Sequence, residues 1–273
     1  MIDSLLFTTF LKFSFFFFFF LFWKTTQDQG YHVFTMICRG PNGCVYEGQM
    51  SDGTPVVIKR IARSAADFTR EANLMVGLDH PNVMRMLNAV AYNDYLDIVL
   101  ERGVPLTAIM AQRVLPLGEL VKYLREITLG LDYLHREGLV HCDIKPHNII
   151  VVDGVAKVAD FGSAVPLPPG VESTGLVKGT AVYMSPEATR GLPFTRTTDI
   201  WSLGVLLYHV ATGHIPYHGY RSSVIAYKIG ETGVLPALEH PDPTIVKFYT
   251  YCTEKVPASR ATTPQLLAML RGL

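Results

Sequence analysis

Between residues 33 and 101 the apolar residues fall in short runs that are separated by turn-forming residues. Residues 55–59 (PVVIK) and 95–101 (YLDIVLE) are rich in β-branched residues, and glycines or the sequence His80-Pro81-Asn82 stand between such runs. Short runs of this composition, bounded by glycine, proline or asparagine, are typical of β-strands. We therefore predict that this part of the chain is mainly a β-sheet.

Apolar residues at helical spacing dominate the later part of the chain. In residues 116–137, leucine or isoleucine recurs at positions 120, 124, 127, 131 and 134. This spacing places the side chains on one face of a helix that packs against a core. The same criteria predict helices over residues 64–77, 199 to about 211 and 264–271, with others after Gly219 and after Pro243.

The length, the charge balance and the cysteine content of the chain limit the classes of protein to which it can belong. The 273 residues suffice for one large domain or two lobes. Basic and acidic residues number 24 each, so no net charge draws the chain to nucleic acid or to anionic lipid. The 4 cysteines show no metal-ligand spacing and are too few for a disulfide framework, which favours a reducing compartment. We therefore expect a cytoplasmic protein with no nucleic-acid partner.

Residues 1–27 form an apolar lead, with an unbroken phenylalanine run from Phe15 to Phe20, and we keep three interpretations of it. A membrane anchor fits the length, because about 20 apolar residues span a bilayer. Lys12 near the middle would cost such an anchor roughly 2.5–3.5 kcal/mol. Lys24 and Asp3 on its two flanks would place the rest of the chain in the cytosol. The other interpretations are a translated pyrimidine-rich tract or disordered lead, and a packed helix.

Residues 141–148 (HCDIKPHN) combine a carboxylate, a cation and an amide. Asp143 can accept a proton from a hydroxyl, Lys145 can stabilise developing negative charge, and the amide oxygen of Asn148 can bind a hard metal ion. Apolar residues 149–152 and 155–159 then predict a two-stranded ribbon, which returns a second carboxylate, Asp160, to the first. Phosphoryl transfer needs a group that orients the nucleophile and oxygen ligands for magnesium, and this stretch supplies both.

These residues resemble the signature motifs of the eukaryotic protein kinases. Residues 141–148 are similar to the catalytic loop and Asp160-Phe161-Gly162 to the magnesium-binding motif, and other motifs follow in order over about residues 34–270. The resemblance implies an α+β kinase fold over residues 28–273, with a small β-rich N-lobe (about 31–102) and a larger helical C-lobe (about 103–272). At Lys145 and Thr180 the chain resembles the serine/threonine kinases, and over residues 179–204 its sequence resembles that of MAP kinase kinase kinases.

The resemblance implies a catalytic centre that uses ATP and Mg²⁺. Asp143 would orient and deprotonate the substrate hydroxyl, Lys145 would stabilise the transferring phosphoryl group, and Thr180 would bond to both. Asn148 and Asp160 would hold the magnesium. The expected activity is transfer of the γ-phosphoryl group of ATP to serine or threonine hydroxyls of protein substrates, under an upstream activator or regulatory partner.

A second set of residues would bind the nucleotide. Lys59 would contact the α- and β-phosphates and would pair with Glu71, with Asp67 as a weaker candidate for that ion pair. Backbone groups of residues 101–103 would bind the edge of adenine. The complete predicted set is Ile37, Gly40, Gly43, Val45, Lys59, Glu71, Leu100, Glu101 and Gly103.

The chain departs from the family pattern at two cysteines. Cys38 stands where the first glycine of the glycine-rich loop is usual, and Cys142 where most members carry an arginine that binds a phosphate on the activation segment. The resemblance thus implies less dependence on phosphorylation of that segment, in which Ser173 and Thr174 are the candidate phosphosites. The alternative to an enzyme is a scaffold that binds ATP without turnover, and these departures are its support.

One further pair implied by the resemblance is structural. Glu187, which closes the activation segment, would form a buried ion pair with Arg260. Removing one partner of such a pair typically costs about 3–5 kcal/mol, so the pair would support the fold and not the chemistry.

Overall fold

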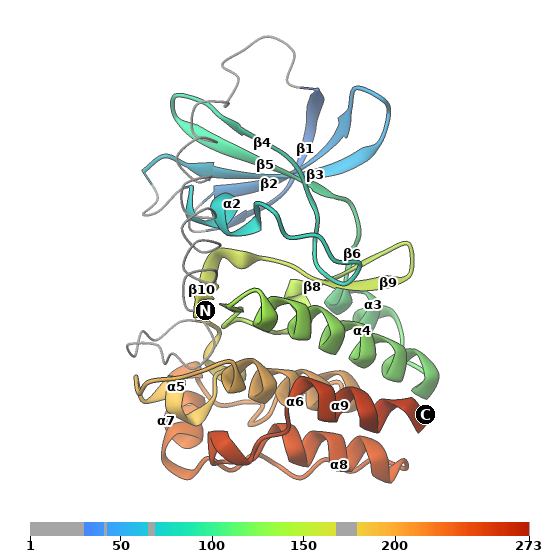
Figure 1. Cartoon of the computed structure of the whole chain (residues 1–273), viewed down its shortest axis with the longest axis vertical. Helices are drawn as coiled ribbons and strands as arrows, with labels where there is room; N and C mark the ends of the chain where they lie inside the picture. Colours follow the sequence, from blue (N-terminus) through green and yellow to red (C-terminus); the bar gives the residue numbers. More distant parts are fainter. Residues whose placement is uncertain (1–29, 41–42, 65–68, 168–178, 273) are drawn as a thin grey trace, which may run out of the picture. The chain divides into compact units, whose positions relative to one another are not determined.

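The computed structural model describes residues 30–40, 43–64, 69–167 and 179–272. They form two compact units, one from the described residues up to Ala72 together with Met86–Arg102, and the other from Asn73–Arg85 together with the described residues from Gly103 onward. The first unit holds a five-stranded sheet, and the second holds most of the helices (Figure 1). The prediction of an α+β fold, with a β-rich part followed by a mainly helical part, is confirmed.

The first unit is built on an antiparallel sheet in the order β1-β2-β3-β5-β4. Its strands are β1 (Tyr31–Gly40), β2 (Gly43–Met50), β3 (Pro55–Ala62), β4 (Met86–Ala91) and β5 (Tyr95–Glu101). The apolar residues Val56, Ile58 and Val99 are fully buried and pack with Tyr31 on one face. The two β-branched runs of the sequence are therefore neighbouring strands, β3 and β5, in the interior of the sheet.

Helix α2 (Arg70–Met75) is shorter than the helix predicted over residues 64–77. Ser64 and Thr69 lie in turns, and the residues between them are outside the described part of the chain. Gly77 has a φ of +80°, a left-handed conformation that commonly follows the end of a helix. The helix prediction is confirmed for residues 70–75 and was too long at its C-terminal end.

The second unit contains the two long helices α4 (Leu117–Arg136) and α6 (Thr197–Thr212). The apolar stripe predicted for α4 is buried, as expected. The other helices of the described residues are α3 (Leu106–Gln112), α5 (Pro186–Thr189), α7 (Ser222–Thr232), α8 (Pro243–Cys252) and α9 (Thr263–Met269). Its short strands are β6 (Val104–Pro105), β7 (Leu139–Val140), β8 (Ile149–Val152), β9 (Val155–Val158) and β10 (Val165–Pro166). Single helical turns are η1 (Pro146–Asn148), η2 (Phe161–Ser163), η3 (Ala181–Tyr183), η4 (Pro257–Ser259) and η5 (Leu270–Gly272).

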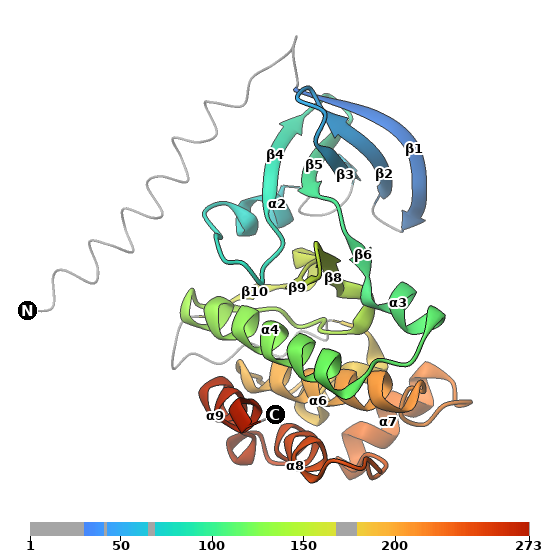
Figure 2. The ribbon, with the colours of Figure 1, turned by 90° about the vertical axis from the view of Figure 1, so that its right-hand side faces the viewer.

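Helix α6 lies between α4 and α8 (Figure 1 and Figure 2). Its residues Trp201, Leu203 and Val205 are completely buried, as expected of a helix that is covered on every side. Gly204 permits the close contact with α8, because a Cβ there would lie 2.7 Å from the Cβ of Cys252. Because α6 is buried and closely packed, it holds the residues of its first and last turns in fixed positions, where they contact other segments.

Several sequence predictions fall outside the described residues. These are the apolar lead of residues 1–27, Asp67, Ser173 and Thr174. Among the residues that the structure describes, no helix combines the length and the hydropathy that crossing a bilayer requires.

Candidate active site

A β-hairpin brings the predicted catalytic loop and Asp160 together. Strand β8 starts directly after Asn148, β9 ends just before Ala159, and Ile149 pairs with Val158. The hairpin therefore returns Asp160 to Asn148, and the N–H of Ala159 donates to the carbonyl oxygen of Asn148 at 2.9 Å. The two-stranded ribbon predicted from the apolar runs is confirmed.

Both carboxylate oxygens of Asp143 accept hydrogen bonds. The backbone N–H and the Oγ1 hydroxyl of Thr180 each donate to Oδ1 at 2.9 Å. The Nζ of Lys145 donates to Oδ2 at 2.7 Å, and the Nδ2 of Asn148 donates to the same oxygen at 3.0 Å. Lys145 also donates to the Oγ1 of Thr180 at 2.7 Å. The structure thus brings together the three predicted catalytic residues and fixes the orientation of the carboxylate.

Gly179, which the sequence analysis did not name as a site residue, lets Thr180 approach this carboxylate. Its φ is +100°, a conformation that favours glycine. A Cβ at this position would lie 2.3 Å from the carbonyl oxygen of Cys142 and 3.5 Å from Oδ1 of Asp143. The backbone at Gly179 is therefore in direct contact with the catalytic loop.

Gly179→Ala is expected to reduce both stability and phosphate transfer. The positive φ alone costs about 1–3 kcal/mol for a residue with a side chain, and the clash with Cys142 displaces Thr180 from Asp143. Misplacement by about 1 Å near a reacting group can cost about 100-fold in rate. Urea unfolding and a transfer assay measure the two effects. Gly154→Ala is the control, because Gly154 has a φ of +80° but nothing within 4 Å of an added Cβ; an equal loss of transfer in both variants would contradict the prediction.

Asp199, in the first turn of α6, holds the backbone of the catalytic loop. Its Oδ1 accepts the N–H of Cys142 at 2.8 Å, and its Oδ2 accepts the N–H of His141 at 2.9 Å and lies 2.8 Å from Nε2 of His135. Burial by itself would raise the pKa of Asp199, but the hydrogen bond and charge of His135, together with His141, hold the pKa below its ordinary value. Asp199 is therefore a fixed anionic anchor beneath the loop.

Two buried histidines complete this support. The sequence analysis missed His135, which is 4% exposed in the last turn of α4 and meets Asp199. His141 accepts the N–H of Asp143 on Nδ1 at 3.3 Å, and its Nε2 lies 3.0 Å from the carbonyl oxygen of Ala159. Through its two ring nitrogens, His141 therefore links the backbone beside Asp143 to the backbone beside Asp160.

Cys142 lies in an apolar cluster. It is 8% exposed and packs with Val140, Leu167 and Phe194, while its Sγ donates to the carbonyl oxygen of Val140 at 3.6 Å. Its φ is +65°, unusual for a residue with a side chain. The position that carries a phosphate-binding arginine in most kinases is thus filled by apolar packing in this chain.

Cys142→Arg is therefore expected to destabilise the protein by about 3 kcal/mol or more, since it places an unpaired charge among apolar side chains. Cys142→Ala, which adds no charge and only removes a sulfur, should cost about 1 kcal/mol. Thermal and urea unfolding of both variants make the comparison. An arginine variant as stable as the alanine variant would show that the cluster has room for a charged side chain.

The two predicted metal ligands lie at adjacent ends of the β8–β9 hairpin. Asn148 is 2% exposed and uses its amide nitrogen toward Asp143, which directs its amide oxygen away from that carboxylate. Asp160 has a φ of +66°, and its side chain is exposed at the surface of this unit. Magnesium prefers oxygen ligands and is usually held by one or two carboxylates together with phosphates and water. The donor types at these positions fit that ion.

In the first unit, Lys59 and Glu71 form the predicted ion pair. The Nζ of Lys59 lies 2.8 Å from Oε1 and 2.7 Å from Oε2 of Glu71, and Glu71 is 6% exposed. Lys59 lies opposite Val45 on β2 and opposite Ile98 on β5. The pairing fixes the lysine head group on the side of the sheet that also carries Val45.

The glycines of the predicted glycine-rich loop close the β1–β2 pair. Gly40 pairs with Gly43 at the end of the two strands, and Cys38 pairs with Val45. A Cβ on Gly43 would lie 1.9 Å from the carbonyl oxygen of Arg60, so β3 requires a glycine there whether or not a ligand is bound. Ile37 lies on β1 with 53% of its surface exposed, which leaves an apolar side chain open at this strand.

The three remaining predicted nucleotide residues belong to different units. Leu100, opposite Val57, and Glu101 end β5 of the first unit. Gly103 belongs to the second unit, where a Cβ at this position would lie 2.6 Å from the carbonyl oxygen of Val151 on β8. The glycine is therefore required by contact with β8, a reason that the sequence did not reveal.

Residues 31–270 match the family model described as protein kinase domain. The chain is 30% identical over 251 residues to "Serine/threonine-protein kinase TIO" of Arabidopsis thaliana, covering 87% of this chain and 19% of the relative. It is 32% identical over 254 residues to "Mitogen-activated protein kinase kinase kinase ANP1" of Arabidopsis thaliana, covering 85% and 38%. It is 31% identical over 265 residues to "Serine/threonine-protein kinase PkaB" of Streptomyces coelicolor, covering 89% and 63%. The chain thus spans less than two thirds of the length of each of these relatives.

Proposed function

The chain belongs to the protein kinase family, and we propose on that basis that it transfers the γ-phosphoryl group of ATP to serine and threonine hydroxyls of protein substrates. The observation that supports this most directly is the set of hydrogen bonds among Asp143, Lys145 and Thr180. They hold a proton acceptor and a cation beside one another within a single unit, and Thr180 fits a serine/threonine enzyme.

In the proposed reaction, Asp143 orients the substrate hydroxyl and accepts its proton as the new bond to phosphorus forms. Lys145 Nζ, 2.7 Å from Asp143, stabilises the negative charge of the transferring group. Thr180 holds both side chains, since its Oγ1 donates to Asp143 and accepts from Lys145. Electrostatic stabilisation by groups that are already in place is commonly the largest contribution to such catalysis.

Asn148 and Asp160 would hold Mg²⁺, which when bound neutralises charge on the β- and γ-phosphates. Lys59, held by Glu71 at 2.7 Å, would position the α- and β-phosphates. The strand residues Ile37, Val45 and Leu100 would contact the adenine. This assignment uses the same residues that the sequence motifs indicated.

The test is phosphate transfer by the full chain with γ-labelled ATP, Mg²⁺ and a generic protein substrate, followed by phosphoamino-acid analysis. We expect label on serine or threonine, and a loss of about 100-fold or more in Lys59→Met, because positioning groups commonly contribute that much. Lys247→Met, an exposed lysine of α8, is the matched control. A folded chain that binds ATP but transfers no label would support the scaffold alternative, which Cys38 and Cys142 favour.

We also propose that the kinase works in the cytosol, because ATP is its phosphate donor and its 4 cysteines are thiols, as is usual in a reducing compartment. An anchor formed by residues 1–27 would place the kinase on the cytosolic face of a membrane. Fractionation of cells that express the full chain, or a chain without residues 1–27, separates the two: recovery of only the full chain with membranes would establish the anchor.

A further inference from the structure

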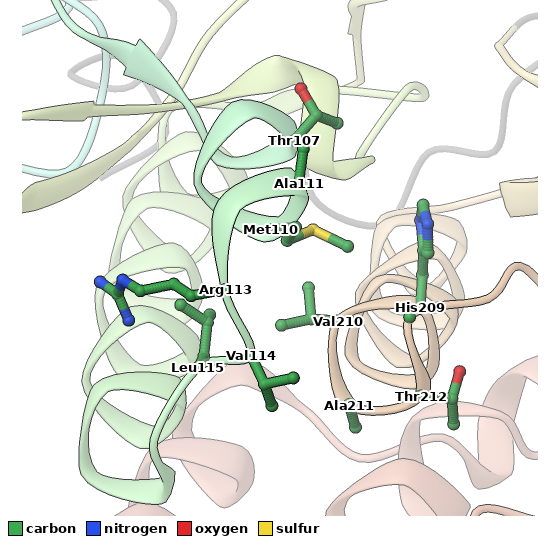
Figure 3. A pocket seen from close by; sticks show the side chains of 11 residues that line it. Thr107, Met110, Ala111, Arg113, Val114, Leu115, His209, Val210, Ala211 and Thr212 are labelled. Carbon is green, nitrogen blue, oxygen red and sulfur yellow. The ribbon is translucent and has the colours of Figure 1, made fainter.

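A cavity of about 330 Å³ lies in the second unit between α3 and the C-terminal end of α6. Figure 3 shows Met110 of α3 and Val210 of α6 on its two sides, with His209 on the α6 side. Val114, at its edge, is 85% exposed, so the cavity opens to solvent beside an apolar side chain. The volume falls at the lower end of the range for small-molecule sites.

The charge at the cavity is already matched by the protein. Among the described residues that line the cavity, only Arg113 is permanently charged. Its guanidinium donates to both carboxylate oxygens of Glu119, at 2.7 and 2.8 Å, and Figure 3 shows the side chain extending away from His209 and Val210. A bidentate ion pair of this kind leaves little charge for a ligand to neutralise. The cavity therefore favours a neutral molecule over an anion.

His209 supplies the cavity with a polar group. Burial, with the nearby His214, lowers the pKa of His209, so the ring is neutral near pH 7. Its Nδ1 lies 2.7 Å from the hydroxyl of Tyr183, whose pKa is raised by burial and which therefore stays protonated. A neutral imidazole that uses one nitrogen toward Tyr183 offers its second nitrogen to a ligand.

Tyr183 connects this ring to the catalytic aspartate. The N–H of Tyr183 donates to the carbonyl oxygen of Thr180 at 2.8 Å, and the hydroxyl of Ser202 donates to the carbonyl oxygen of Tyr183 at 2.7 Å. Thr180 in turn donates to Oδ1 of Asp143 through both its N–H and its hydroxyl. Hydrogen bonds at the hydroxyl and the backbone N–H of Tyr183, joined through the covalent structure of Tyr183 and Thr180, thus link the wall of the cavity to the centre of the active site.

We propose that this cavity binds a neutral, mostly apolar small molecule with one hydrogen-bonding group, and that His209 and Tyr183 convey its presence to Thr180 and Asp143. A ligand that contacts His209 stabilises the arrangement in which the ring meets Tyr183, and it thereby favours the held form of Thr180. The proposed binding of the ligand does not depend on the proposed kinase activity, whereas the proposed effect of the ligand on turnover rests on that activity.

Binding is tested with 3-phenylpropanamide, a neutral probe, and 3-phenylpropanoate, an anion of the same size. The full chain carries ¹³C-methyl methionine, and the Met110 signal is assigned with Met110→Leu. For about ten non-hydrogen atoms we expect a dissociation constant of about 1 mM for the amide and weaker binding of the carboxylate. Tighter binding of the carboxylate would overturn the proposed ligand class, and a Met110 shift that does not saturate would overturn the site.

The cavity is blocked by Ala111→Trp, at an exposed position on the cavity wall. Gln112→Trp places the same ring at the next exposed residue, which does not line the cavity. We expect Ala111→Trp to weaken amide binding at least tenfold and Gln112→Trp to leave it within about twofold. Equal binding by both variants would show that the probe occupies another place.

The coupling is measured in two ways. The NMR signal of the Thr180 backbone N–H is followed in the same titration and requires no activity, and phosphate transfer is measured at a saturating concentration of 3-phenylpropanamide. We expect the Thr180 signal to move and transfer to rise about twofold or more in the wild type. Tyr183→Phe keeps the ring but removes the hydroxyl, so it should bind the amide and lose both responses. The coupling would be overturned if both responses persisted in Tyr183→Phe, or if the wild type bound the probe without a shift of the Thr180 signal. A shift of the Thr180 signal without any phosphate transfer would instead contradict the proposed function.

Discussion

Asp143→Asn is expected to lower the kcat of phosphate transfer about 10³-fold, with the KM for ATP changed less than about twofold. Asparagine has the size of aspartate but cannot take the proton of the substrate hydroxyl, and general-base catalysis commonly contributes about 10²–10⁴-fold. There is a second cost, because both oxygens of Asp143 accept hydrogen bonds. An amide group must turn its NH₂ either toward the donors of Thr180 or toward Lys145, so one set of bonds is lost.

Steady-state kinetics on the full chain measure this prediction, and Asp153→Asn is the matched control. Asp153 lies in the turn between β8 and β9, is exposed and has a φ of +49°. Asparagine tolerates that left-handed conformation, so the control should fold and transfer phosphate like the wild type. A kcat of Asp143→Asn above about a tenth of the wild-type value would mean that the hydroxyl loses its proton to another group.

The sequence predicted best those parts of the site whose neighbours are close along the chain. Asp143, Lys145 and Asn148 lie within one short loop, and the apolar runs after Asn148 predict the hairpin that returns Asp160. The turn and the pattern of buried side chains determine the register of the two strands of such a hairpin. The position of Asp160 relative to Asn148 is therefore strongly restricted. The sheet was predicted for the same reason, since local composition indicates strands directly.

The sequence was least informative where distant segments determine a residue's role. Gly179 is needed because the backbone of Cys142 occupies the space of a side chain, and Gly103 because β8 does. His135 was indistinguishable from other polar residues of α4 until Asp199 was placed against it. A single sequence contains no signal for such contacts between segments, which arise from packing of elements that are far apart in the chain.

The ion pair between Glu187 and Arg260, by contrast, was predicted across a long interval and is present. Nη1 and Nη2 of Arg260 lie 2.6 and 2.7 Å from the two carboxylate oxygens of Glu187, and the Arg260 side chain is completely buried. Arg260 also donates to the carbonyl oxygens of Thr197, Glu254 and Lys255, and its guanidinium lies 5.1 Å from the centroid of the Trp201 ring. One side chain therefore joins the end of the activation segment, α6 and the turn before α9.

Arg260→Met is expected to lower the free energy of unfolding by about 3–5 kcal/mol, because it leaves a buried carboxylate at Glu187 without its cation and three carbonyl groups without their donor. Urea unfolding followed by circular dichroism measures the change. Arg136→Met is the control: Arg136 also meets a carboxylate, Asp132 at 3.1 Å, but its side chain is 67% exposed. An exposed pair contributes about 0.5 kcal/mol or less.

The double variant Glu187→Leu/Arg260→Met separates the ion pair from the packing around it. If the main cost of Arg260→Met is an unpaired buried charge, removing Glu187 as well should restore part of the stability, because two apolar side chains can replace a buried pair at little cost. If the main cost is instead the loss of the bonds to these three carbonyl oxygens, the double variant should be no more stable than Arg260→Met. The side chain of Glu187 is only 8% exposed, so its unpaired charge would destabilise the protein more than the lost bonds would, and we expect the double variant to recover at least about 1 kcal/mol.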